Sequence, residues 1–317
     1  MTVTDQAVAF PETAVRSTAL LRASAKKSFD PFVAVDWAVP LDDRAYHLPP
    51  EELPLYGTAL YASLSEPERI AYSRHQCAAL CGTGIWLENI LMRLLVDHAY
   101  DLYATDPVLR YVLVEVGDEC RHSSMFAEYI LRAGTPAYRP PPKVRHLGRV
   151  VRSAYGLASS LVAVLAAEEL LDASNRATAR DESLHPVSRA IARVHIVEEA
   201  RHVAFARTHL KELWPRLSAP SRALAALVAP FTVDVISRAT IQPEVYAALN
   251  IPDGDRVARE NPVYRRRVAE NLQRLTEFLT TLGVIQPWTK PIWHKLGLLT
   301  PTAPHRSRRL PRKTALA

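Results

Sequence analysis

Apolar and polar positions repeat with the 3.6-residue period of an α-helix through most of the chain. The segment Ser65-Glu66-Pro67-Glu68 combines a capping box with a proline in the first turn, which predicts a helix start. Gly134-Thr135-Pro136 is a typical helix end. No segment alternates as a strand does, so the fold class is predicted to be all-α. The long helices are expected at about 65–103, 106–132, 147–180, 186–213, 218–247 and 262–282.

The segments between and around these helices are less regular. Residues 1–64 are expected to wrap the core, with one short helix around 12–27 and a proline-rich stretch at 31–56. Gly82 and Gly84 are expected to loosen the first long helix, and Pro230 to kink the helix at 218–247. We therefore predict one helical domain over residues 1–317. It has a four-helix core at about 65–215, flanking helices in the N-terminal wrap and at 216–283, and a tail at 284–317.

The helix at 186–213 carries His195, Glu199 and His202 at positions i, i+4 and i+7, which lie on one helical face. Glu119-x-x-His122, on the helix at 106–132, repeats the spacing of Glu199-x-x-His202. Imidazoles and carboxylates in such a row are typical of a metal site, although one such helix alone could also be a solvated face.

Two further glutamates complete the pattern. Carboxylate-bridged dimetal sites in four-helix bundles take Glu-x-x-His from two helices and one glutamate from each of the other two. Glu88 precedes Glu119 by 31 positions, and Glu168 precedes Glu199 by the same 31. Equal offsets indicate two copies of one helical hairpin. Glu169 is the alternative to Glu168, but it shares its helical face with polar residues.

Four other residues near this pattern have more than one possible role. His195 is predicted as a seventh ligand, or else as a hydrogen-bonded histidine at the edge of the site. Glu115 occupies the equivalent position one turn before Glu119, and it is expected beside the site, in a channel or on the surface. Asp118 and Glu198 directly precede the two ligand glutamates. They could orient a ligand histidine on a neighbouring helix, or they could face solvent.

Composition narrows the setting of such a site. The N-terminus lacks the pattern of a secretory signal, and no stretch of about 20 residues is free of charge, so neither secretion nor a membrane span is expected. Three cysteines give no disulfide framework, which fits the cytoplasm. The net charge of +6 is largely due to five basic residues within 306–313, so nucleic acid is not an expected partner.

The motifs resemble those of the AurF-type diiron oxygenases, the p-aminobenzoate N-oxygenase family. They are Glu88 in W-L-E-N, Glu119-Cys-Arg-His122, Glu168 in A-E-E-L and His195-x-x-x-Glu199-Ala-Arg-His202. The resemblance covers roughly residues 60–215 and implies a ferritin-like, homodimeric enzyme with two iron ions held by these seven residues. It would use O2 as co-substrate, through a peroxo-diiron intermediate, to oxidise an amine, typically an arylamine, to hydroxylamine and nitro products.

The resemblance also implies partners. An external electron donor, either a ferredoxin-type reductase system or a small reductant, would reduce the iron. Family members that accept p-aminobenzoate need polar groups for its carboxylate, but the turn from Leu80 to Gly84 contains no Arg or Tyr. Asp172 is expected to face the substrate pocket and to repel a carboxylate, and Thr83 is expected close to the same pocket. A neutral or cationic amine, or a larger amine tethered to another group, is therefore the expected substrate.

Two other functional classes remain open at this point. One is a different dimetal enzyme, such as a desaturase, a hydroxylase or a mixed Mn/Fe oxidase, although His195 argues against these. The other is a non-enzymatic bundle for iron storage or metal sensing. Storage bundles are usually shorter, whereas the flanking helices of this chain fit a pocket or a dimer interface.

Overall fold

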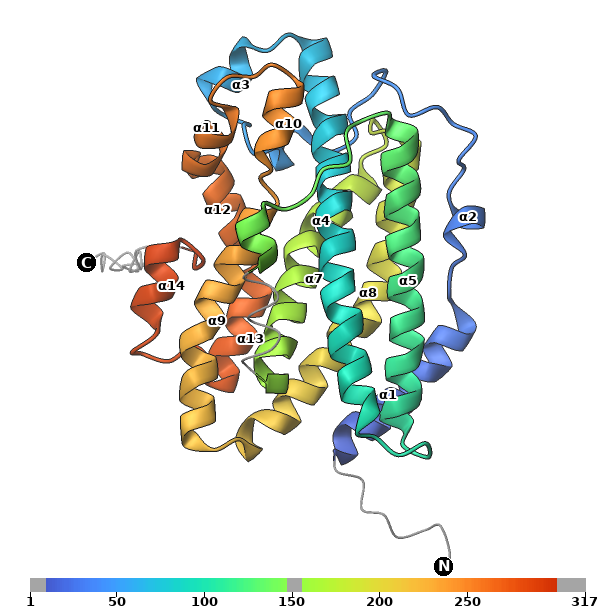
Figure 1. Cartoon of the computed structure of the whole chain (residues 1–317), viewed down its shortest axis with the longest axis vertical. Coiled ribbons are helices and arrows are strands. Elements are labelled where there is room, and N and C mark those ends of the chain that lie inside the picture. Colours follow the sequence, from blue (N-terminus) through green and yellow to red (C-terminus); the bar gives the residue numbers. More distant parts are fainter. Residues whose placement is uncertain (1–9, 147–155, 301–317) are drawn as a thin grey trace, which may run out of the picture.

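The computed structural model describes residues 10–146 and 156–300 and contains only helices, turns and irregular segments in that part of the chain. The all-α prediction is confirmed. Four long helices form the core: α4 (Glu66–Tyr100), α5 (Pro107–Ala133), α7 (Gly156–Arg180) and α8 (Pro186–Leu213). Figure 1 shows them side by side as two hairpins, α4 with α5 and α7 with α8, in a ferritin-like arrangement.

The ends of the core helices follow from local capping. In the predicted capping box, the backbone N–H of Ser65 donates to the Glu68 carboxylate at 2.7 Å. At the start of α5, the Asp106 carboxylate accepts the N–H of Val108 at 2.8 Å. Gly134 ends α5 in the left-handed region, with φ of 60°, where a residue without Cβ is unstrained. The predicted start of the third core helix, near residue 147, lies outside the described residues.

The N-terminal segment covers one side of this core. Helix α1 (Pro11–Lys26) packs across α5 and α8, where the Glu212 carboxylate accepts hydrogen bonds from the backbone N–H and the hydroxyl of Thr13. The chain then runs along the bundle through α2 (Pro31–Ala34), η1 (Pro50–Glu52) and α3 (Ala59–Ser63) before α4 begins (Figure 1). This segment places Ser28 and Phe29 against the middle of α8.

The C-terminal helices lie on the opposite side of the core, against α7 (Figure 1). Their bounds, after the short η2 (Trp214–Arg216), are α9 (Ala219–Ala239), α10 (Pro243–Ala248), α11 (Gly254–Glu260), α12 (Pro262–Asn271), α13 (Gln273–Leu282) and α14 (Lys290–Leu296). The two long helices expected at 218–247 and 262–282 are therefore each split into two helices. Gln242 is extended because it precedes a proline, which separates α9 from α10, and Leu272 separates α12 from α13.

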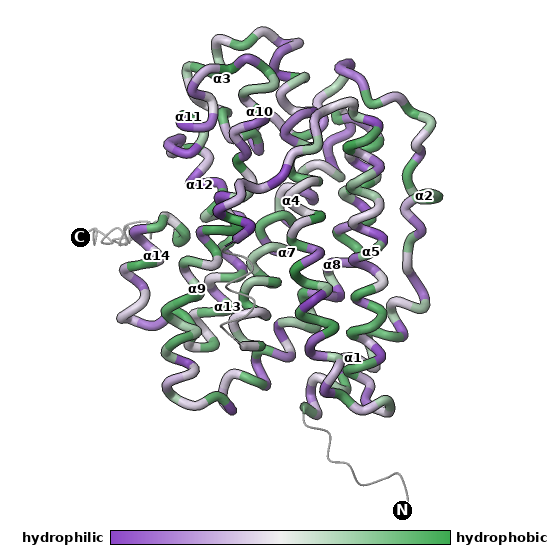
Figure 2. The backbone as a smooth tube through the Cα atoms, in the orientation of Figure 1, coloured by the Kyte–Doolittle hydropathy of each residue, from purple (hydrophilic) through white to green (hydrophobic). Residues whose placement is uncertain are grey.

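Two further details concern the C-terminal part. Pro230 lies inside α9, which continues on both sides of it, and the predicted kink there remains a prediction. The segment predicted as a tail from residue 284 begins with packed structure, since Val284 and Trp293 are fully buried. Figure 2 shows that apolar and polar residues alternate along the core helices, as expected where each helix turns one side inward. Residues 66–100 and 219–248 are long and apolar enough to span a membrane by composition, but both belong to this helical assembly.

Candidate metal centre

The centre of the four-helix core contains a cluster of acidic and imidazole side chains. Each core helix contributes at least one of them, and the seven predicted ligands are at most 4% exposed. They are Glu88 from α4, Glu119 and His122 from α5, Glu168 from α7, and His195, Glu199 and His202 from α8. Buried carboxylates without a compensating cation are costly, so this cluster requires a physical explanation.

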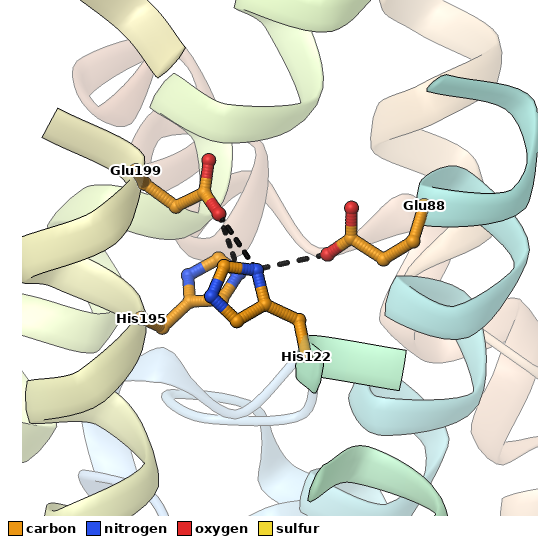
Figure 3. A group of neighbouring side chains, drawn as sticks. All are labelled: Glu88, His122, His195 and Glu199. Carbon is orange, nitrogen blue, oxygen red and sulfur yellow. Dashed lines mark ion pairs between the residues drawn. The ribbon is translucent and has the colours of Figure 1, made fainter. Parts of the chain in front are cut away.

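One part of the cluster, the first ligand group, comprises Glu88, His122, His195 and Glu199 (Figure 3). One potential ligand atom from each residue lies within 4.8 Å of the others. His122 Nδ1 is 3.0 Å from Glu199 Oε1, and His195 Nε2 is 3.6 Å from the same oxygen. His195 Nε2 is also 3.7 Å from Glu88 Oε1. The geometry therefore places His195 inside the cluster rather than at its edge.

The second ligand group comprises Glu115, Glu119 and His202, again with potential ligand atoms within 4.8 Å of one another. His202 Nδ1 is 2.9 Å from Glu119 Oε1 and 3.0 Å from Glu199 Oε2. His122 Nδ1 is 3.0 Å from the other oxygen of Glu119. Glu119 and Glu199 thus each face both histidines of the Glu-x-x-His motifs, which is the arrangement that bridging carboxylates need.

The unsatisfied atoms of the cluster fit a pair of cations. One oxygen each of Glu88, Glu115, Glu119, Glu168 and Glu199 is buried without a hydrogen-bond partner. His122 lies close to Glu199 Oε1, and His202 lies close to Glu119 Oε1, but neither pair has the geometry of a hydrogen bond. Such contacts are expected when both groups point at a shared metal ion. Carboxylate oxygens and imidazole nitrogens together are suitable ligands for iron and related divalent ions.

Electrostatics support the same conclusion. Burial, and then the neighbouring carboxylates, raise the pKa of Glu88 and of Glu168 well above the usual range. For Glu168 the neighbouring carboxylates are Glu199 and Glu88, so it also faces the cluster. Burial lowers the pKa of His195 to about 4, which keeps its imidazole neutral and able to bind a cation. Cations would hold these glutamates in their ionised form.

The second nitrogen of each Glu-x-x-His histidine contacts an acid from the other hairpin. His122 Nε2 on α5 is 2.9 Å from Glu198 on α8, and His202 Nε2 on α8 is 3.3 Å from Asp118 on α5. An N–H donated to these carboxylates leaves Nδ1 of each ring with its lone pair toward the cluster. This geometry matches the role proposed for Asp118 and Glu198 from sequence.

Three neighbours that the sequence argument did not single out support these contacts. Arg201 lies 3.1 Å from Asp118 and 3.5 Å from Glu198, so it balances the charge of both acids. The backbone N–H of Phe29 donates to Glu198 at 3.1 Å. The side-chain nitrogen of Asn175 is 3.0 Å from His195 Nδ1. Asn175 follows Glu168 by seven residues on one helical face, which is a spacing signal in the sequence.

Three candidates occupy other places. Glu169 accepts a hydrogen bond from Arg207 at 2.9 Å, so Glu168, not Glu169, faces the cluster. Asp172 pairs with Arg176 at 2.7 Å and does not line the cavity beside His195. Thr83 donates to a backbone carbonyl of its own helix and accepts from Gln242. Asp172 and Thr83 therefore do not line the His195 cavity, and their predicted places at a substrate pocket remain predictions.

A hollow, the His195 cavity, opens beside the first ligand group. Its cavity volume is about 50 Å³, and about 550 Å³ of empty space is present when the open mouth is counted. Besides His195, its polar lining includes Asn175 and Ser188, and its apolar lining includes Phe126 and Ile191. No Asp, Glu, Lys or Arg of the described residues lines it. The cavity therefore suits an apolar or aromatic molecule without a charged group at its inner end.

Comparison with known proteins agrees with this geometry. Residues 11–283 match the protein family described as p-aminobenzoate N-oxygenase AurF. Uncharacterized proteins from Mycobacterium tuberculosis (strain ATCC 25618 / H37Rv) and Mycobacterium bovis are each 30% identical to this chain over 232 residues. The matched region covers 71% of this chain and 68% of each relative. The family match extends over all four helices that build the cluster, and the chain belongs to the p-aminobenzoate N-oxygenase (AurF) family.

Proposed function

We propose that this protein is an O2-dependent N-oxygenase that binds two iron ions in the buried cluster and oxidises an amine held in the His195 cavity. Membership of the family supports a diiron oxygenase in general. The observation that carries the proposal for this chain is the convergence of seven buried ligand side chains, four of them with an unsatisfied carboxylate oxygen. These seven side chains together can bind two cations.

The side chains divide the work of holding the metal. Glu119 and Glu199 lie where they can bridge two ions, because each faces both His122 and His202. Glu88 and Glu168 supply a further carboxylate from the remaining two helices. Bound iron would supply the electron transfer to O2 that protein side chains cannot perform. A mixed Mn/Fe pair fits the same ligands.

Neighbouring charged side chains orient the two Glu-x-x-His histidines and fix which ring nitrogen carries the proton. Asp118 and Glu198 accept the Nε2–H of His202 and His122, while Arg201 offsets the negative charge of both acids. The His195 cavity would bring the substrate amine beside His195, whose Nε2 is 3.7 Å from Glu88 Oε1. Electrons for repeated turnover must come from an external donor, either a reductase with a ferredoxin or a small reductant.

The cavity lining supports a substrate class. Charged partners such as Arg or Lys bind a carboxylate most strongly, and no Arg or Lys lines this cavity in the described structure, where the hydrogen-bonding side chains are neutral ones such as Asn175 and Ser188. Phe126, Ile191 and Leu80 instead offer an apolar surface to an aromatic ring. The substrate proposed here is therefore an uncharged arylamine rather than p-aminobenzoate. We further propose that the enzyme acts as a homodimer in the cytoplasm.

The test is direct oxidation of amines. The full-length protein would be loaded with Fe(II) under nitrogen, supplied with a reductant, and mixed with ¹⁸O2 and either aniline or p-aminobenzoate. The expected result is ¹⁸O in hydroxylamine or nitro products of aniline, with slower oxidation of p-aminobenzoate. Iron-loaded protein that transfers oxygen to no amine would contradict the proposed reaction. Faster oxidation of p-aminobenzoate would contradict only the proposed substrate class.

A further inference from the structure

Glu115 is a buried carboxylate that the seven-residue ligand set does not use. It lies one turn before Glu119 on α5, is 1% exposed, and belongs to the second ligand group with Glu119 and His202. Its Oε2 has no hydrogen-bond partner. Within residues 10–146 and 156–300, no Lys or Arg forms an ion pair with it. An unpartnered carboxylate therefore points into the same space as two metal-ligand residues.

Asp118 and Glu198 are the buried acids near Glu115 that also lie outside the seven-residue set, and both of them have charged partners. Asp118, three residues further along α5, pairs with Arg121, Arg201 and His202. Glu198 contacts Arg201, His122 and the backbone of the N-terminal segment. The two nearby arginines are thus engaged by the acids that face away from the centre. A cation at the centre is the remaining partner for Glu115.

The duplicated hairpins give a second reason. His195 precedes Glu199 by one helical turn, and Glu115 precedes Glu119 by one helical turn. Positions four residues apart lie on the same helical face, so both side chains turn toward the cluster. His195 falls in the first ligand group and Glu115 in the second. Each Glu-x-x-His helix therefore presents one additional donor, an imidazole in one case and a carboxylate in the other.

We propose that Glu115 is a further ligand, to the ion that His202 holds, and that the two ions consequently have different donor sets. This inference rests on the dimetal site of the proposed function. The ion of the first group would be bound by two imidazoles, from His122 and His195. The ion of the second group would be bound by one imidazole and an additional carboxylate. Oxygen donors favour harder ions such as Mn²⁺, so the second position should discriminate less strongly between manganese and iron.

Charge balance indicates when Glu115 matters most. The four glutamates Glu88, Glu119, Glu168 and Glu199 together neutralise two ferrous ions. Oxidation of both ions to the ferric state adds positive charge that these four cannot balance. A fifth carboxylate in the buried site would stabilise the oxidised pair over the reduced pair. Replacing Glu115 by a neutral residue should therefore make the iron pair easier to reduce.

The alternative is that Glu115 is a buried acid that remains protonated and does not touch metal. Burial raises its pKa to about 8, which is compatible with that alternative in metal-free protein. The substitution Glu115→Gln distinguishes the two, because glutamine keeps the size and polarity of a protonated glutamic acid but is a poor metal ligand. Glu169→Gln is the matched control, since Glu169 is also buried but faces Arg207.

The experiment measures metal directly. Full-length wild-type protein and both variants would be loaded with ⁵⁷Fe(II) under nitrogen and passed through a desalting column, and their iron content and Mössbauer spectra would be recorded. The wild type and Glu169→Gln should hold two ions per chain with the same spectrum. In Glu115→Gln, affinity for one of the two ions should fall at least about tenfold, because even residues outside the ligand shell commonly have effects of this size. The spectrum of that ion should also change.

Each other outcome has a defined meaning. Two tightly bound ions with an unchanged spectrum in Glu115→Gln would overturn the ligand assignment and leave the proposed function intact. Failure of the wild type to bind two ions would overturn the dimetal proposal itself, and with it this inference. Circular dichroism of the metal-free proteins would establish that both variants fold, and a Glu115→Asp variant, which restores a shorter carboxylate, should recover part of the lost affinity.

Discussion

The two helical hairpins of the core carry the same ligand frame in different surroundings. Both place a glutamate 31 residues before a Glu-x-x-His motif, and both place an acid directly before the motif glutamate. That acid reaches across to the histidine of the other hairpin in each case. The pairing is reciprocal, so neither hairpin can form a complete site alone.

The difference begins one turn before each motif. His195, on the second hairpin, lines a cavity with polar and aromatic walls. Glu115, on the first, lines an apolar hollow together with Val164, Phe205 and His209. The comparison teaches that a duplicated ligand frame can be functionally asymmetric. Both hairpins contribute metal-binding residues, whereas the hollows beside them differ in lining, with several polar side chains at the His195 end and mainly apolar ones at the Glu115 end of the described structure.

The largest effect is expected at the two glutamates that face both histidines. Glu119→Ala and Glu199→Ala should each remove both ions and lower turnover more than about a hundredfold, beyond the effect of altering residues outside the ligand shell. The two losses should be equal if the hairpins contribute equally. Iron content and amine oxidation would be measured beside Glu169→Ala, which should retain two ions. Retention of both ions by either variant would remove that residue from the bridging position.

Next in size are the acids behind the histidines. Asp118→Asn and Glu198→Gln should each weaken metal binding about 10–100-fold, because each leaves a ligand imidazole without its carboxylate partner. Chelator competition would measure the affinities. Only Glu198 also accepts the backbone N–H of Phe29, so Glu198→Ala, which removes the acceptor, should cost an additional 1–3 kcal/mol or so of unfolding free energy compared with Asp118→Ala. Equal stability of the two alanine variants in urea would show that this backbone contact contributes nothing.

The glutamates of the cluster show how much of the site the sequence could predict. The repeated spacing favoured Glu88 and Glu168, with Glu169 as the alternative, because positions on ideal helices follow from periodicity alone. It could not place Thr83 or Asp172 relative to the His195 cavity, since their partners Gln242 and Arg176 are chosen by tertiary packing and side-chain rotation.

The limits elsewhere have similar causes. The breaks at residues 240–242 and at Leu272 are set partly by packing of the C-terminal helices, and only the proline at 243 was a visible signal. The His195 cavity is formed by several helices at once, and no local pattern describes its shape. Periodicity thus predicted which side chains meet, while the space around them required the fold.

A pair of cavity-filling substitutions tests the functional asymmetry. Ile191→Phe should narrow the His195 cavity and raise KM for an arylamine about tenfold or more, without loss of iron. Val164→Phe fills the apolar hollow beside Glu115 and should leave KM unchanged. Both should cost about 1–3 kcal/mol of stability through overpacking, so stability serves as the internal control. A larger change in KM for Val164→Phe would place the substrate at the opposite end.

The smallest effect concerns pH and two buried histidines outside the centre. Burial lowers the pKa of His209 to about 3 and that of His47 to about 4. His209 lies near His98 and Glu212, and His47 contacts Tyr129. Both pKa values are depressed because the folded protein keeps these two histidines neutral. Their contribution to the stability of the fold is therefore fully present above pH 6.5 and is lost as the pH falls toward 4.

The slope can be measured in urea. Each histidine should lower the free energy of unfolding by up to about 1.4 kcal/mol per pH unit below pH 6.5, since the unfolded chain takes up a proton that the folded chain does not. His209→Gln should remove one such contribution at the end of the core near α1, and the variant should show a shallower slope between pH 6.5 and 4. An unchanged slope would mean that His209 titrates normally in the folded protein.

The central claim is that side chains from both hairpins together bind two metal ions. The most direct test is the amount of iron retained per chain after anaerobic loading with Fe(II) and removal of free metal. The account predicts two ions per wild-type chain, and their joint loss when either Glu119 or Glu199 is replaced by alanine. Retention of no iron by the folded wild-type protein, or of a single ion that survives both substitutions, would contradict it.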